Sequence, residues 1–244
     1  LDEGNTEIFF IKKCMRGHIQ AILFDFDGVL ADTMKDHFAA WNEALKQYGA
    51  AIDPEHFYVL EGMPVSLMAR EICKCAGIRD GFAEKLLFDK ERYYLASHRF
   101  SFYPGVEQYI SWLHEKGIPM AMVSGGRLER IRASAPERFL KKMNTIITGE
   151  STERGKPFPD AYLEGSRRLG VSANACLVVE NAPLGIQSAK SAGMYCIAIT
   201  STLPRAVLAE ADEIVDSFAA FTESPAMLSL LPSVSFKKLN HKQI

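Results

Sequence analysis

The chain has 244 residues, enough for one large domain or for a domain that carries a smaller one. Hydrophobic residues make up 48% and charged residues 24%, the balance of an ordinary globular protein with a full apolar core. The formal net charge of -2 gives no footprint for nucleic acid, and no apolar run has the length of a membrane span. We expect a cytoplasmic protein without nucleic-acid or membrane partners, as a monomer or a weak homodimer.

Short apolar runs that end abruptly in polar residues or glycine recur along the chain. They cover residues 21–24, 120–123, 145–147, 177–179 and 196–199. Continuous runs of this kind are typical of strands buried on both faces of a parallel sheet. Between them, apolar residues repeat at helical spacing toward glycines such as Gly117 and Gly170, which suit helix C-termini. This alternation predicts an α/β fold with a doubly wound parallel sheet.

The segment from about Met34 to Phe102 breaks the alternation, because it has helical patterns and no strand pattern. Its clearest signal is an apolar stripe at steps of three and four residues, formed by Met34, Phe38, Trp41, Leu45 and Tyr48. Further helices are predicted around residues 66–76 and 81–97. The segment is therefore interpreted as a helical insertion between the first and second strands.

These patterns divide the chain into a core and an insertion. The core is predicted to comprise residues 18–33 and 103–235, and an α-helical cap is predicted for residues 34–102. Residues 1–17 are interpreted as an N-terminal extension and residues 236–244 as a C-terminal tail.

The five cysteines form neither a disulfide framework nor a metal-binding pattern. Cys73 and Cys75 are separated by one residue, whereas zinc sites usually place two to four residues between paired cysteines. Cys176 and Cys196 lie inside apolar runs, which predicts that they belong to the core. This usage is typical of a reducing, cytoplasmic setting.

Polar residues gather after the predicted strands, where ligands bind in an open α/β sheet. They are Asp25, Asp27, Ser124, Glu180 and Asn181, together with Lys156 on the loop after the third strand. Three carboxylates so close together repel one another, and a bound divalent cation would relieve the repulsion. Oxygen ligands without histidine or cysteine favour Mg²⁺ over zinc. The sequence therefore predicts a magnesium site at this edge of the sheet.

The same residues suit the transfer of a phosphoryl group. The cation and the Lys156 ammonium would neutralise phosphate oxygens, while Ser124 and the Gly125 amide would donate hydrogen bonds. Asp25 could then attack phosphorus and form an aspartyl-phosphate, which divides one difficult step into two. Asp27 is placed to protonate the leaving oxygen and later to deprotonate the incoming water.

Some polar residues near these positions could also serve the local structure. Ser124 could cap a helix that begins near Arg127, in addition to binding phosphate. Asp32 and Thr33 are expected to cap the first helix of the cap rather than to contact the substrate.

Four parts of the chain resemble, in the same order, the four sequence motifs of the haloacid dehalogenase superfamily. They are residues 25–33 (Asp-Phe-Asp-Gly-Val-Leu-Ala-Asp-Thr), Ser124, residues 155–160 (Gly-Lys-Pro-Phe-Pro-Asp), and residues 179–186 (Val-Glu-Asn-Ala-Pro-Leu-Gly-Ile) with residues 192–194 (Ala-Gly-Met). Each motif alone is weak, but all four in order are specific. The chain is identified as a member of this superfamily, with a resemblance that covers roughly residues 18–220.

The resemblance implies a Rossmann-like core with an inserted helical cap. It implies that Asp25 is the nucleophile and Asp27 the general acid and base. It also implies that Ser124 and Lys156 bind the phosphate.

The resemblance further implies a magnesium site. The cation would be held by Asp25, the backbone carbonyl of Asp27 and the side chain of Asn181, with Glu180 in support. Many relatives have an aspartate where this chain has Asn181. Since the amide removes one negative charge, it should weaken magnesium binding somewhat.

The superfamily also contains dehalogenases, which attack carbon. Dehalogenation needs neither a general acid nor a metal, so the presence of Asp27 favours phosphoryl transfer. In the cap, residues 37–41 resemble the opening of the β-phosphoglucomutase cap, in which a histidine at the place of His37 helps to regulate acid–base action. Glu61 and Gly62 resemble part of the substrate-specificity loop of that cap.

One departure separates this chain from the mutases. They have an arginine three residues after the loop glycine, which grips the phosphate that is not transferred, and here that position is Val65. Arg70, Lys90 or Arg92 could replace it. We therefore predict a magnesium-dependent phosphatase acting on a small phosphorylated metabolite. A β-phosphoglucomutase-like phosphomutase and an inactive phosphate-binding module are the alternatives.

Overall fold

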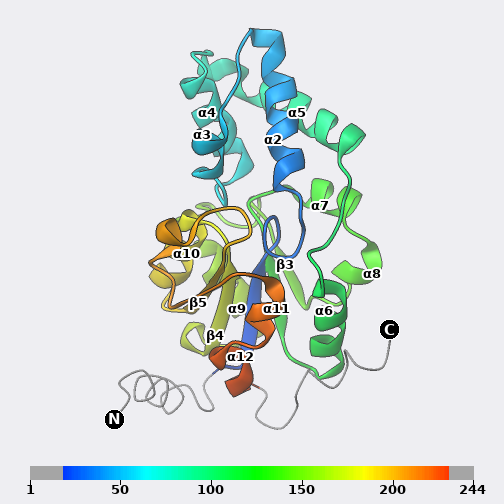
Figure 1. Ribbon diagram of the computed structural model, residues 1–244, viewed down its shortest axis with the longest axis vertical. Helices are drawn as coiled ribbons and strands as arrows, with labels where there is room; N and C mark the ends of the chain where they lie inside the picture. The colour runs from blue at the N-terminus through cyan, green and yellow to red at the C-terminus, as the bar shows by residue number, and fades with distance from the viewer. Residues whose placement is uncertain (1–18, 231–244) are drawn as a thin grey trace.

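The computed structural model of the protein describes residues 19–230 (Figure 1). The interpretations of residues 1–17 as an extension and of residues 236–244 as a tail lie outside this part, as do residues 231–235 of the predicted core. The described part consists of a parallel sheet with helices on both faces and a further group of helices beyond one end of the sheet.

Six parallel strands form the sheet in the order β3-β2-β1-β4-β5-β6. They are β1 (Ala21–Asp25), β2 (Met120–Val123), β3 (Thr145–Ile147), β4 (Cys176–Glu180), β5 (Tyr195–Ile199) and β6 (Glu213–Val215). The strand order runs outward in one direction from β1 and in the other from β4, so the topological switch lies between β1 and β4. The predicted Rossmann-like doubly wound sheet is confirmed, and such sheets bind ligands at the switch.

The sequence patterns locate five of these strands to within one residue at each end but miss β6. This strand has three residues, of which only Val215 is buried, and it pairs with β5 at the edge of the sheet. So short a strand with two half-buried positions lacks the continuous apolar run by which the others are recognised.

Alternate residues of each strand enter two separate cores, one on each face of the sheet. The helices are α6 (Val106–Glu115), α7 (Leu128–Ser134), α8 (Glu137–Leu140), α11 (Phe218–Thr222) and α12 (Pro225–Leu230) on one face, and α9 (Asp160–Leu169) and α10 (Pro183–Ser191) on the other. Ile22 and Phe24 of β1 pack against the first group, and Leu23 packs against the second. Cys176 and Cys196 lie in the second core, as their sequence context predicts.

Residues 34–102 form the group of helices beyond the sheet (Figure 1). It comprises α2 (Met34–Leu45), α3 (Pro54–Tyr58), α4 (Val65–Cys75), α5 (Ala83–Ser97) and two short 3₁₀ turns at residues 46–48 and 80–82. The predicted apolar stripe packs in a core of its own, which includes Trp41 and Leu45. The sequence patterns miss α3, although Asp53 caps it by accepting from His56 N at 2.8 Å. No helix in the described part is both long and apolar enough to cross a membrane.

Two adjacent segments connect these helices to the sheet. Asp32 N donates to Ser101 O at 2.9 Å, and Tyr103 N donates to Leu30 O at 3.1 Å. The chain therefore leaves the core and returns to it at one place. We propose on this basis that residues 34–102 are a separate cap domain, tethered by two neighbouring segments.

Candidate active site

The turn after β1 presents two carboxylates at the edge of the sheet. Asp25 is the last residue of β1, and Asp27 follows in a turn whose backbone amides bond to Phe26 O at 3.0 and 2.9 Å. Gly28 has φ +93, and a Cβ there would lie 2.2 Å from Asn181 Nδ2. Only glycine fits both the positive φ and this close approach. The turn therefore fixes both carboxylates next to Asn181, which follows β4.

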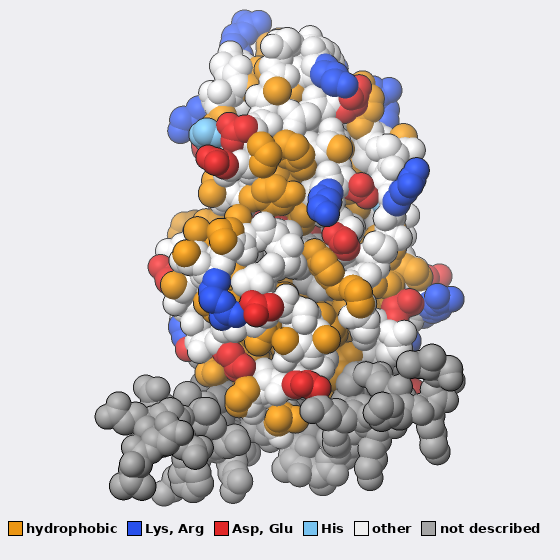
Figure 2. Space-filling model, viewed as in Figure 1, with side chains coloured by type: hydrophobic (Ala, Val, Ile, Leu, Met, Phe, Trp, Pro, Cys, Tyr) orange, Lys and Arg blue, Asp and Glu red, His pale blue; other side chains and the backbone are white. Residues whose placement is uncertain are grey.

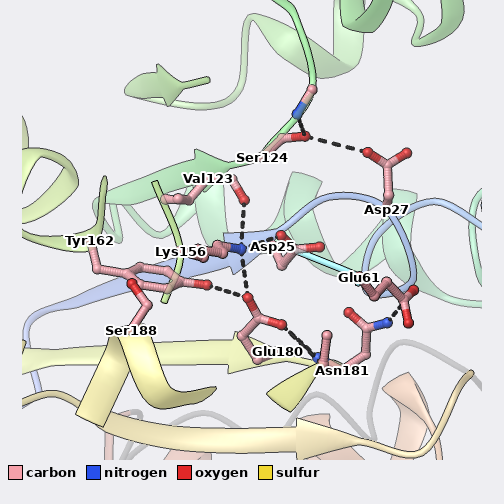
Figure 3. Close-up of polar contacts among 12 residues, drawn as sticks. Asp25, Asp27, Glu61, Val123, Ser124, Lys156, Tyr162, Glu180, Asn181 and Ser188 are labelled. Carbon is pink, nitrogen blue, oxygen red and sulfur yellow. Dashed lines mark hydrogen bonds and ion pairs between the residues drawn. The ribbon is translucent and has the colours of Figure 1, made fainter. Parts of the chain in front are cut away.

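Lys156 joins the ends of β1 and β4. Its Nζ lies 2.5 Å from Asp25 Oδ1 and 2.5 Å from Glu180 Oε1, and all three side chains are buried. Figure 3 shows Lys156 between the two carboxylates. One ammonium thus faces two carboxylates, so this buried cluster carries an excess of negative charge unless a proton or another cation joins it.

Glu180 is the most firmly held of the three. Its Oε1 also accepts a hydrogen bond from Tyr162 at 2.7 Å, and its Oε2 accepts from the amides of Asn181 and Ala182 at 2.9 and 3.2 Å. A Cβ on Gly185 would lie 1.7 Å from Glu180 Oε1, so the start of α10 needs glycine at that position. Glu180 therefore acts as an anchor that orients Lys156.

The pKa values reflect this crowding. Burial raises the pKa of Asp25 to about 8, with Glu180 acting in the same sense and Lys156 against it. Burial lowers the pKa of Lys156, but Asp25 and Glu180 outweigh it and hold the pKa above its ordinary value. Lys156 is thus a permanent cation, whereas Asp25 needs a further positive charge nearby to be a stable carboxylate.

Asp27 points away from this cluster into a cage of donors. Its Oδ1 accepts from Thr33 Oγ1 at 2.7 Å and lies 3.2 Å from His37 Nε2. Arg130 donates to both carboxylate oxygens at 2.9 and 2.6 Å, and Ser124 Oγ lies 3.3 Å from Oδ2. Burial raises the pKa of Asp27, but Arg130 and His37 outweigh it and hold the pKa well below its ordinary value. Asp27 is therefore an ionised carboxylate in this structure.

The sequence analysis did not name Arg130, which α7 carries into the site. Its side chain is 4% exposed, and its bidentate contact with Asp27 joins residues 103 positions apart in the chain. The local signal is Gly126, because a Cβ at that position would lie 2.2 Å from the Arg130 guanidinium. Gly126, four residues before Arg130 and two residues after Ser124, leaves the space that this side chain occupies.

Two expected capping roles are wrong. Thr33 stands at the N-cap of α2, but its hydroxyl makes no capping bond and donates to Asp27 instead. Ser124 does not cap α7, which begins at Leu128; its hydroxyl accepts from Gly126 N at 3.1 Å and faces Asp27. In both cases the hydroxyl donates to the charged Asp27 carboxylate instead of accepting from the free N–H groups at a helix N-terminus.

The cap contributes a second polar group that reaches Asp27. His37 on α2 stacks on Tyr94 with ring centroids 4.1 Å apart, and its Nδ1 lies 3.0 Å from Lys90 Nζ. Burial, together with Lys90, lowers the pKa of His37 to about 3, so the imidazole is neutral. The contacts then assign the proton to Nε2, which donates to Asp27, while Nδ1 accepts from Lys90.

Of the three cations that could replace the missing mutase arginine, only Lys90 lines the pocket described below. Arg70 is exposed on α4, and Arg92 lies 3.5 Å from Asp89. Lys90 is 3% exposed and lies over the rings of Trp41 and Tyr94. Burial, with Arg130 nearby, lowers the pKa of Lys90 to about 7.

A pocket lies between the cap and the carboxyl edge of the sheet. Its polar lining includes Asp25, Asp27, His37, Glu61, Lys90, Ser124, Gly125 and Arg130, and its other lining residues include Gly62, Val65, Met34, Trp41, Phe57, Met63 and Met68. Val65 N donates to Gly125 O at 3.1 Å, which joins the cap loop directly to the core. The interior volume of about 60 Å³ has room for roughly two water molecules. The cap loop is therefore in contact with the core, an arrangement that we call the closed form.

Asn181 has one side-chain atom without a partner. Its Nδ2 donates to Glu61 Oε1 and to Thr202 Oγ1, both at 2.9 Å, and Thr202 donates to Glu61 Oε2 at 2.8 Å. Its Oδ1 is buried and unpaired, and Figure 3 shows the amide oxygen turned toward Asp25 and the nitrogen toward Glu61. Burial raises the pKa of Glu61, which these hydrogen bonds oppose.

A buried, unpaired amide oxygen beside a carboxylate fits an oxygen-seeking cation. Among the described residues, no three His, Cys, Asp or Glu side chains form a metal site by themselves. A cation here would therefore need Asn181 and a backbone oxygen in addition to Asp25. The donor set is one that suits Mg²⁺.

The fold and the site together define a doubly wound α/β protein with an inserted group of helices and an aspartate at the end of its first strand. Residues 22–199, more than half of the chain, match the family model of haloacid dehalogenase-like hydrolases. The chain belongs to this family, as its four motifs predict.

The relatives of the chain include phosphatases. It is 31% identical over 205 residues to hexitol phosphatase A of Escherichia coli (strain K12), covering 83% of this chain and 93% of that protein. It is 30% identical over 196 residues to a phosphoglycolate phosphatase of Pseudomonas savastanoi pv. phaseolicola, covering 73% and 68%. A candidate beta-phosphoglucomutase from Bacteroides vulgatus has a similar structure, with a TM-score of 0.77, 26% identity and coverage of 92% and 97%. These similarities support phosphatase or phosphomutase activity on small phosphorylated metabolites.

Proposed function

We propose that the protein is a magnesium-dependent phosphatase that hydrolyses a small phosphate monoester through an aspartyl-phosphate on Asp25. The observation that carries the proposal is the buried bridge of Lys156 between Glu180 and Asp25, which lines the pocket. It pairs a potential nucleophile with a permanent cation at the switch point of the sheet. The phosphatase names of the relatives support the same reaction class.

Magnesium is part of the proposal because the oxygen donors fit it. Asp25, the backbone carbonyl of Asp27 and Asn181 Oδ1 would hold the cation, with Glu180 in support. When bound, it would neutralise phosphate oxygens and the excess negative charge near Asp25.

In the first half-reaction, Asp25 attacks phosphorus while Lys156, Ser124 and the Gly125 amide bind the phosphate oxygens. Asp27, which must first leave the Arg130 guanidinium and take up a proton from water, protonates the leaving oxygen as the bond from that oxygen to phosphorus breaks. In the second half-reaction, Asp27 accepts a proton from the water that attacks the aspartyl-phosphate. The ionised state of Asp27 supports this second role.

A released-phosphate assay tests the proposal. The substrates are hexitol phosphates, phosphoglycolate, sugar phosphates and nucleotides, each with Mg²⁺ and with EDTA. We expect release that depends on Mg²⁺ for at least one substrate class. No release from any of them would overturn the proposal, and retained phosphate binding in that case would favour an inactive phosphate-binding module.

A phosphomutase is the second candidate, favoured by the two cations in the pocket. Val65 stands where the mutases have their arginine, but Lys90 and Arg130 bring positive charge to the same pocket. Turnover of β-glucose 1-phosphate with trace glucose 1,6-bisphosphate separates the two functions. Glucose 6-phosphate as the main product would establish the mutase, whereas free phosphate alone would support the phosphatase.

A further inference from the structure

Glu61 is a carboxylate of the cap that is buried against the core. It lies in the loop between α3 and α4 and is 2% exposed. Its contacts are with Asn181 and Thr202 of the core, more than a hundred positions along the chain. No lysine, arginine or histidine in the described part forms an ion pair with it, whereas buried carboxylates in proteins are usually paired or bound to metals.

The hydrogen bonds around Glu61 fix the direction of the Asn181 amide. Both amide protons are donated, one to Glu61 Oε1 and one to Thr202 Oγ1, and the Thr202 proton goes to Glu61 Oε2. Reversing the amide would place its oxygen against Glu61 Oε1, which offers no proton when Glu61 is ionised. The Asn181 oxygen must therefore face the other way, toward Asp25, where it is buried without a partner (Figure 3).

The charges at this place would not balance if every carboxyl group were ionised. Asp25, Glu180 and Glu61 are buried carboxylates, and Lys156, which pairs with the first two, is the one cation in contact with them among the described residues. Asn181 contributes an oxygen but no charge. The Asn181 amide group thus has two different neighbours. Its oxygen faces a place without a hydrogen-bond partner, and its nitrogen faces Glu61, which has no ion-pair partner among the described residues.

Resting on the proposed function, we infer that Glu61 is a positioning residue for the cation. It holds Asn181 Oδ1 toward the cation and supplies, from the cap, the negative charge that the neutral amide lacks. Because Glu61 makes these contacts only when the cap is closed, cation binding and cap closure favour each other.

Magnesium binding to the full chain tests this inference without any turnover. Glu61→Gln keeps the size of the side chain and removes its charge. We expect isothermal titration to give a dissociation constant for Mg²⁺ at least about tenfold higher than that of the unaltered protein, as is typical when a supporting residue is lost. Glu91→Gln is the matched control, since Glu91 is a cap carboxylate that lines the same pocket but has no contact with Asn181. It should bind Mg²⁺ like the unaltered protein.

A charge exchange gives a second measurement. Asn181→Asp alone places two carboxylates against each other, and we expect it to melt at a lower temperature without Mg²⁺ and to gain more from Mg²⁺. The double variant with Glu61→Gln and Asn181→Asp moves the charge from cap to core, and we expect it to recover most of the magnesium affinity that Glu61→Gln loses.

The melting temperature without metal distinguishes a role of Glu61 in cation binding from a purely structural role. Glu61→Gln replaces a buried carboxyl group that has no cationic partner among the described residues, so we expect it to melt no lower than the unaltered protein when EDTA is present. A lower melting temperature with unchanged magnesium affinity would overturn the inference and leave Glu61 a structural contact, while the proposed phosphatase would stand. An unaltered protein that neither binds Mg²⁺ nor releases phosphate would overturn both.

Discussion

At the scale of single residues, Asp27 is held in a state suited to accept a proton. Arg130 contacts both of its oxygens, and Thr33 and His37 contact one of them. A substrate that needs Asp27 as an acid must therefore separate Asp27 from Arg130. Arg130 then becomes free to bind an anionic part of the substrate. The strength of the ion pair between Arg130 and Asp27 can be measured directly.

We expect Arg130→Gln to lower the free energy of unfolding by about 3 kcal/mol, because breaking a buried pair leaves an unpaired charge. Urea denaturation measures the change. The double variant with Asp27→Asn and Arg130→Gln has neither charge, so it should regain part of the loss. A double variant whose losses simply add would show that the two side chains are not coupled.

Asp25→Asn is expected to reduce phosphate release by at least about a thousandfold, as the loss of a nucleophile does. The fold should persist, because the amide removes a buried carboxylate that lies near Glu180 and has a raised pKa. Phosphate release and circular dichroism on the same sample measure the two effects. Retained activity would identify a different nucleophile.

At the scale of elements, α5 carries a lysine that makes the stability of the cap depend on pH. Lys90 has a pKa of about 7 in the folded chain and an ordinary value of 10.5. Between these values the unfolded chain binds a proton that the folded chain does not, so the stability of the unaltered protein rises with pH. The other charged or titratable groups near this lysine are His37, Tyr94, Arg130, Glu91 and Asp27.

Lys90→Met should therefore melt at a higher temperature than the unaltered protein at pH 6, by a few degrees. The difference should shrink as the pH rises from 7 toward 9, since the unaltered protein no longer carries the buried charge. Thermal melts across this range measure it. Lys74→Met, on the exposed face of α4, is the matched control and should give no pH-dependent difference. A constant offset for Lys90→Met would contradict the prediction.

At the scale of the whole molecule, the pocket is lined by residues of both the cap and the core, so its shape depends on how the cap is placed. Figure 2 shows hydrophobic side chains gathered on the cap above the junction with the core. The pocket between the cap and the core has an interior volume of about 60 Å³. The two neighbouring segments at Asp32 and Tyr103 connect the cap to the core, so we expect the cap to rotate about them when it opens.

We expect Mg²⁺ and vanadate, an analogue of phosphate, to stabilise the closed form together. At one hundred times the dissociation constant the gain is about 2.7 kcal/mol, and the melting temperature rises accordingly. Small-angle scattering should record a smaller radius of gyration with both ligands than with neither. An unchanged radius with a raised melting temperature would mean that the cap does not open in solution.

Much of the fold follows from contiguous stretches of sequence. The apolar runs of β1 and β4 specify buried strands, and the polar residues that end them, Asp25 and Glu180, come to the same edge because the strands are parallel. The stripe that includes Trp41 specifies a helix for the same local reason. Short elements such as β6 and α3 lack a full period of either pattern and were missed.

The sequence by itself determined most of the strands and helices, the place of the helical insertion, and the group of residues proposed for phosphoryl transfer, since each depends on neighbouring positions. The tertiary structure alone decided the partners of those residues. Asp27 and Arg130 are 103 positions apart, and Glu61 and Asn181 are 120 positions apart. Nothing in either local pattern selects these pairs, because they form only when α7 packs beside the first turn and the cap closes on β4.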